Sequence, residues 1–117
     1  MSHERGTAER PLATQVENLL ASSSVPKAEW ADQKLTRDGY RVMIYGGGCV
    51  EVAYVGSDAP LEERQSHLTQ LMQLLQGHYG DETVEIQGSV WKVDIESTRL
   101  MSEYPTIYAR LRWIRSV

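Results

Sequence analysis

The sequence has no phenylalanine and a single cysteine, Cys49. One cysteine excludes a disulfide within the chain, and a free thiol suits a reducing compartment. We therefore expect a cytoplasmic protein. Without phenylalanine, three tryptophans and six tyrosines must supply the aromatic bulk of the core.

Long apolar runs and strong charge of one sign are also missing. No apolar segment approaches the roughly 20 residues that a membrane-spanning helix needs. The first eleven residues, MSHERGTAERP, are polar and mixed in charge, unlike a secretory signal. The net charge of −4 argues against general affinity for nucleic acids, because phosphate binding needs concentrated positive charge. The composition indicates a soluble domain.

The length of 117 residues fits one domain. Residues 1–10 lack apolar periodicity and predict a flexible arm, so the domain is expected over 11–117. Apolar residues at helical or alternating spacing predict helices over 11–22 and 59–76 and strands near 28–36, 40–45, 49–55, 83–87 and 90–96. The predicted fold is α+β, with two helices packed on an antiparallel sheet of five or six strands.

The last segment, 105–117, fits two structures. Its apolar residues alternate as in a half-buried strand, but Pro105 could also open a helix. We favour the strand. Earlier in the chain, the alternation changes parity near Gly88, which requires an even-length turn or a bulge, and we favour the turn.

The segment 39–56 predicts a β-hairpin around three consecutive glycines. A two-residue loop would oppose Val42 with Glu51 and mix the two faces, so we predict a three-residue loop, 46–48. The predicted pairs are Tyr45–Cys49, Ile44–Val50, Val42–Val52 and Tyr40–Tyr54. The preceding Asp38-Gly39 predicts another hairpin turn, which would place Leu35 opposite Val42.

The helix over 59–76 has the strongest signals of any predicted element. Ser57 or Asp58 is expected to cap it, Pro60 suits its first turn, and Gly77 is expected to end it. Its apolar stripe includes Leu68, Leu71 and Leu75.

Two families resemble this order of elements. The order, the acidic balance and the size resemble the class I chaperones of type III secretion, which are small homodimers. The helix through Val16–Leu20 and the later Asp38-Gly39 turn also look like a roadblock domain, another dimeric adaptor fold. Both resemblances rest on element order, so no family is assigned.

Residues that could carry catalysis or bind a metal do not form a site. His67 and His78 would lie roughly 16 Å apart on a helix, too far to share one zinc ion. No neighbour in the sequence is placed to activate Cys49, and the three glycines lead into a strand rather than into the helix that a phosphate loop needs. Asp94 and Glu96 are expected on a solvated strand face. We predict no catalytic residue, no metal site and no cofactor.

Charge segregation gives the best candidate site. Residues 98–117 carry a net charge of +3, although the whole chain carries −4. In a strand, Tyr108, Arg110 and Arg112 would project from one face. This strip could pair with Asp94 and Glu96 within the sheet, bind a protein partner or a second copy, or stack on single-stranded nucleic acid.

These patterns favour a non-enzymatic protein–protein interaction module, such as an adaptor, chaperone, inhibitor or assembly component. Its expected contacts are Tyr108, Arg110 and Arg112, with a protein partner or self-association. One alternative is a small enzyme whose site forms at a dimer interface around Cys49, His67 or His78. The other is a single-stranded nucleic-acid binder that uses the C-terminal strip.

Overall fold

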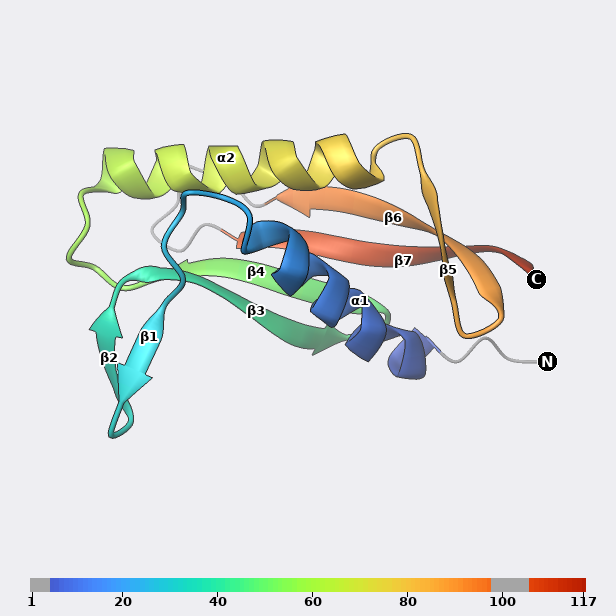
Figure 1. Cartoon of the computed structure of the whole chain (residues 1–117), viewed down its shortest axis with the longest axis horizontal. Coiled ribbons are helices and arrows are strands. Elements are labelled where there is room, and N and C mark those ends of the chain that lie inside the picture. The colour runs from blue at the N-terminus through green and yellow to red at the C-terminus, as the bar shows by residue number, and fades with distance from the viewer. Residues whose placement is uncertain (1–4, 98–105) are drawn as a thin grey trace.

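The computed structural model describes residues 5–97 and 106–117 and confirms the α+β fold. Two helices lie on one side of a five-stranded antiparallel sheet with strand order β3-β4-β7-β6-β5, and β1 and β2 form a separate two-stranded sheet (Figure 1). The elements are α1 (Arg5–Leu20), β1 (Glu29–Ala31), β2 (Lys34–Arg37), β3 (Gly39–Gly46), β4 (Cys49–Val55), α2 (Leu61–Tyr79), β5 (Thr83–Ile86), β6 (Ser89–Ser97) and β7 (Thr106–Ser116).

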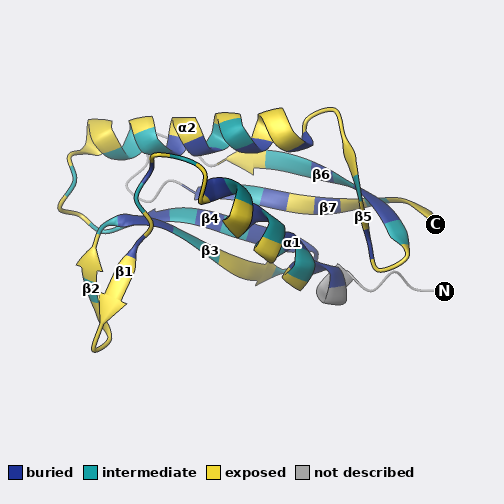
Figure 2. Ribbon diagram, in the orientation of Figure 1, coloured by how far each residue is buried: buried dark blue, intermediate teal, exposed yellow. Residues whose placement is uncertain are grey.

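The core lies between the helices and the face of the sheet that they cover. Residues at helical spacing on α1 and α2 meet every second residue of the central strands, and Figure 2 shows this buried layer. Its fully buried members include Leu12, Val16 and Leu20 of α1, Leu68, Leu71 and Leu75 of α2, and Val50, Val52 and Ile107 of the sheet.

Helix α1 begins at Arg5, so the predicted start at Pro11 is wrong and residues 5–10, predicted as a flexible arm, are helical. The apolar stripe that starts at Leu12 extends back to Ala8, which is also fully buried. Pro11 lies inside the helix but has no backbone N–H to donate to a carbonyl of the preceding turn. The helix ends at Leu20, two residues before the predicted end, and the hydroxyls of Ser22 and Ser23 donate to its last carbonyls, at 2.6 and 2.7 Å.

The pairing of β3 with β4 follows the predicted register except at the turn. Tyr40–Tyr54, Val42–Val52 and Ile44–Val50 are confirmed, but Gly46 rather than Tyr45 opposes Cys49. The turn therefore contains two residues, Gly47 and Gly48, with φ of 61° and 80°, and the three-residue loop is wrong. A bulge at Tyr45 absorbs the extra residue and keeps the apolar face in register.

The segment predicted as the strand 28–36 is instead a small hairpin. Asp32 and Gln33 adopt φ of 51° and 65° in its turn, and Trp30 pairs with Leu35, so Leu35 does not oppose Val42. Figure 1 shows β1 and β2 projecting from the body. Residues 26–28, just before this hairpin, pair with Tyr40 at the beginning of the outer edge of β3. Among the described residues, strands β1 and β2 pair only with each other.

The Asp38-Gly39 pair is not a hairpin turn. The Asp38 carboxylate accepts the N–H groups of Asp58 and Ala59, at 2.8 and 3.0 Å, and so holds the loop before α2. Gly39 lies directly beside the backbone of residues 26–28, and a Cβ on it would stand 2.4 Å from the Pro26 carbonyl oxygen. Close backbone approach, rather than turn geometry, therefore requires glycine here.

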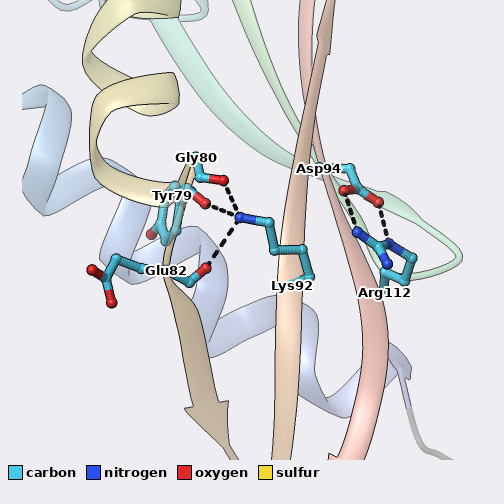
Figure 3. A network of polar contacts seen from close by, with 6 residues as sticks. All are labelled: Tyr79, Gly80, Glu82, Lys92, Asp94 and Arg112. Atoms are coloured by element: carbon cyan, nitrogen blue, oxygen red, sulfur yellow. Dashed lines mark hydrogen bonds and ion pairs between the residues drawn. The ribbon is translucent and has the colours of Figure 1, made fainter.

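Helix α2 differs from its prediction at both ends. Pro60 occupies the N-cap position and no side chain caps the helix, so the capping role of Ser57 or Asp58 is wrong. Gly77 does not end the helix, which continues to Tyr79. The Lys92 ammonium of β6 instead donates to the carbonyls of Tyr79, at 2.7 Å, and of Gly80 (Figure 3). The Lys92 cation, which comes from a strand rather than from the helix, thus binds carbonyls that the end of a helix leaves without partners.

The C-terminal half of the sheet was predicted well. Gln87 and Gly88 form the expected two-residue turn between β5 and β6, both with positive φ. Residues 106–116 form a strand, and β7 lies between β4 and β6.

Leu71→Ala should lower the free energy of unfolding by about 2–5 kcal/mol, because it leaves a cavity where the side chain is fully buried. Leu61→Ala, at a position with 40% exposure on the same helix, should change it by about 0.5 kcal/mol or less. Urea denaturation measures both. Equal effects of the two substitutions would contradict the packing of α2.

Lys92→Met should cost about 1–3 kcal/mol, the usual contribution of hydrogen bonds from a charged donor. The methionine keeps most of the apolar stem but cannot bind the carbonyls at the end of α2. Lys34→Met in the exposed strand β2 is the matched control and should be close to neutral. A loss in the control as large as that at Lys92 would show that removal of positive charge, not the helix end, is responsible.

Candidate protein-binding face

The sheet face opposite the helices carries the candidate site. Cross-strand pairing places Met43, Glu51, Tyr108 and Glu96 in one row across this face. Cys49, Arg110 and Asp94 form the next row. Both helices pack on the other side of the sheet. Within residues 5–97 and 106–117, no helix or additional strand covers this surface. We call it the open face.

Tyr45 and Tyr108 form an aromatic pair on the open face. Their ring centroids are 5.4 Å apart in an edge-to-face arrangement. Tyr45 is the bulged residue of β3 and is 62% exposed, and Met43 nearby is 43% exposed. Partial burial and then the Glu51 carboxylate raise the pKa of Tyr108 above its ordinary value. Its hydroxyl, which is protonated at neutral pH in any case, therefore keeps its proton to a higher pH. The pair gives this face an apolar contact area with polar tips.

Arg112 is held within the sheet. Its guanidinium donates to both carboxylate oxygens of Asp94, at 3.0 and 3.2 Å (Figure 3). These hydrogen bonds, followed by the charge of Asp94, raise the pKa of Arg112. The predicted pairing of the strip with the acidic strand is therefore present for this residue.

Arg110 lies in a different situation from Arg112. It is directly opposite Asp94 in the register, yet the guanidinium makes no hydrogen bond or ion pair to any residue that the structure describes. Its side chain is exposed. Arg110 is therefore the predicted contact that is most available to a partner.

The structure places all three predicted contacts on the open face. Tyr108 is half-buried, whereas Arg110 and Arg112 are exposed. Arg99 and Glu103, which entered the charge balance of the C-terminal segment, lie outside the described residues. The sequence argument missed Tyr45 and Met43 as contact residues. Met43 could have been found, because it alternates with Val42 and Ile44 in the predicted hairpin and so belongs to this face.

Cys49 is on the open face but is fully buried. Burial raises the pKa of its thiol, Arg110 opposes this rise, and Glu96, Glu51 and Glu9 add to it. A catalytic cysteine needs the opposite, an accessible thiol whose pKa is lowered. The environment of Cys49 therefore suits a structural side chain.

His67 and His78 do not assemble with Cys49. His67 on α2 lies 3.2 Å from the Tyr54 hydroxyl through Nδ1, and Tyr54 is five residues further along β4 than Cys49, roughly 16 Å. His78 packs against the Tyr79 ring at the far end of α2, with ring centroids 4.6 Å apart. Among the described residues, no three His, Cys, Asp or Glu side chains are placed to hold a metal ion.

Comparisons with protein-family models, curated proteins and solved structures gave no significant match. The resemblances to secretion chaperones and roadblock domains therefore rest on element order alone. Neither α1 nor α2 is long and apolar enough to cross a membrane.

Alkylation of native Cys49 by iodoacetamide at pH 8 should be at least about tenfold slower than alkylation of the urea-unfolded chain, because burial shields the thiol and raises its pKa. A raised pKa leaves less thiolate at a given pH. The alkylation rate of the native protein should therefore still increase with pH above the ordinary pKa of a thiol. Mass spectrometry follows the modification. Similar rates for native and unfolded protein would refute the buried, protonated thiol.

Proposed function

We propose that this protein is a non-enzymatic protein–protein interaction module and that the open face binds its partner. The observation that carries the proposal is the difference between the two faces of the sheet. The helices bury one face, while the other exposes Tyr45, Met43 and Arg110 beside Tyr108. Tyrosine, methionine and arginine are enriched at protein interfaces, and tyrosine and arginine often dominate binding energy.

The charges on this face suit a protein partner better than nucleic acid. Asp94 neutralises Arg112, and Glu51 and Glu96 flank Tyr108 in the same row. A phosphate backbone would meet these carboxylates together with the arginines, whereas a protein surface can present both signs of charge. The mixed pattern gives no continuous positive path along β7.

The proposed module has no catalytic role for Cys49, His67 or His78. The buried thiol and the contact of His67 with Tyr54 support this part of the proposal. A cytoplasmic location is also proposed, because the one cysteine is free and a reducing compartment keeps it so.

Arg110→Glu should weaken partner binding by about tenfold or more, because it reverses an exposed charge at the proposed contact. Its thermal midpoint should fall only slightly, because no ion pair is lost and the new carboxylate, although it would face Asp94, is exposed to solvent. The matched control is Arg115→Glu. Arg115 is exposed near the end of the same strand, opposite Val90 and beyond an irregularity in the pairing, so it lies outside the rows that contain Tyr108 and Arg110.

The measurement combines capture of proteins from the native host, quantified by mass spectrometry, with sedimentation velocity for self-association. Proteins captured by wild type and by Arg115→Glu, but lost with Arg110→Glu, identify partners of the open face. If the two variants capture the same proteins and both sediment as wild type does, the site assignment is wrong.

A further inference from the structure

The outer edge of β3 already accepts a strand-like segment. Strand β3 is the end strand of the sheet and pairs with β4 on its inner side. On its outer side, Tyr40 N–H donates to the Pro26 carbonyl and the Tyr40 carbonyl accepts Ala28 N–H, at 3.0 and 2.9 Å. This parallel bridge shows that the edge can pair with extended backbone, but it stops at Tyr40.

Two further backbone positions on this edge have no partner within residues 5–97 and 106–117. Because N–H and C=O groups of alternate residues point to the same side of a strand, Val42 and Ile44 direct theirs outward as Tyr40 does. Neither makes an outward backbone hydrogen bond to the residues described here. Ile44 also leaves 42% of its surface exposed. The edge beyond Tyr40 therefore offers two donors and two acceptors beside apolar side chains.

A groove of about 330 Å³ runs along this edge, between α1 and β3. Residues Arg10, Ala13, Thr14 and Glu17 of α1 and Val42, Met43 and Ile44 of β3 line it. The other end strand, β5, has only four residues and an exposed Glu85, features that protect an edge from pairing. Strand β3 has neither protection over 42–44.

The charges at the two ends of the groove have opposite sign. Arg10 follows Glu9, whose carboxylate accepts Gly48 N–H, so Arg10 lies toward the glycine turn. Glu17 lies toward Tyr40, close enough for its charge to act on the tyrosine hydroxyl. Neither Arg10 nor Glu17 forms an ion pair with a described residue. The separation of seven positions from Arg10 to Glu17 corresponds to about 10.5 Å along α1, or about three residues of a strand.

We propose that this groove binds an extended peptide segment of a partner protein, which adds to the sheet as a strand next to β3. Its backbone pairs with Val42 and Ile44, and an apolar side chain enters the groove near Ala13. An acidic side chain meets Arg10 and a basic one meets Glu17, within about four residues of each other. This mode draws affinity from main-chain hydrogen bonds and selectivity from alternate side chains.

A single strand fits this groove better than a second copy of the chain. Helix α1 borders the groove, so a copy that paired through its own β3 would bring a second α1 to the same place (Figure 1). Paired strands lie about 4.8 Å apart, whereas packed helices need 8–10 Å between their axes. A peptide brings no helix with it.

The inference rests on the proposed function as an interaction module but uses another surface, which adjoins the open face at Met43. Variants of Arg110 test the open face and variants of Ile44 test the groove, so the two proposals can fail separately.

The experiment selects binders from a displayed library of random 12-residue peptides against the full chain. The enriched peptides should share an apolar residue between an acidic and a basic one. Ile44→Pro removes the outward N–H without breaking a hydrogen bond to β4. It should weaken the binding of a selected peptide by about tenfold. Ile44→Val keeps the N–H and should bind as wild type does.

Two further measurements guard against misfolding of the proline variant. In the wild-type protein, the selected peptide should slow amide exchange at Val42 and Ile44. The double reversal Arg10→Glu with Glu17→Lys should prefer a peptide whose two charges are exchanged. Circular dichroism and thermal melts establish that each variant is folded.

Several results would overturn the proposal. These are no enriched consensus, equal binding by Ile44→Pro and Ile44→Val, or unchanged amide exchange at Val42 and Ile44. A dimer in sedimentation that Ile44→Pro converts to monomer would instead assign the edge to a second copy.

Discussion

The pairing of β7 with both β4 and β6 is the constraint on which the rest of the structure depends. Without β7, the main sheet would consist of two hairpins, β3–β4 and β5–β6, with no backbone ladder between them. The register that joins them pairs Val50 with Ala109 and Ala109 with Ile95. The pairing of Val50 with Ala109 joins segments about 60 residues apart, so the entropy of closing the loop must be overcome before the core forms.

The central strand also determines how the two faces differ. The residues of β7 that point to the helices include Ile107 and Ala109, which are fully buried. Ala109 lies between Val50 and Ile95, and Ile107 pairs with Val52. The residues between them point away from the helices, where Asp94 can bind Arg112 while Arg110 stays free of such a bond among the described residues. One alternating sequence thus contributes Ile107, Ala109 and Leu111 to the core and supplies the candidate contacts on the other face.

Local pattern was enough to predict the fold class and the pairing of β3 with β4 away from the turn. The alternation around Val42, Ile44, Val50 and Val52 determined the hairpin register, because a shift by one residue would have put charges into the core. The same pattern identified β7 as a strand. Turn details were less predictable: the loop between Ile44 and Val50 has an odd length, which either a longer loop or a bulge can absorb.

The errors arose where a distant segment decides the local structure. Asp38-Gly39 has the composition of a turn, but Asp38 binds the loop before α2 and Gly39 lies against residues 26–28. The end of α2 depends on Lys92, which is 13 residues from Tyr79. The candidate face has the same limit, since strand periodicity places Arg110 and Arg112 together but only the fold shows which arginine binds Asp94.

The contact of Gly39 with the Pro26 carbonyl has an evolutionary consequence. Because the nearest atoms belong to the backbone and cannot rotate away, a side chain of any size at this position would displace residues 26–28. Divergent relatives that keep this architecture should therefore retain glycine here, even where the apolar core has drifted through substitutions of similar volume. An aspartate–glycine pair at the start of the first long strand, followed by a glycine turn about eight residues later, would serve as a signature for finding them.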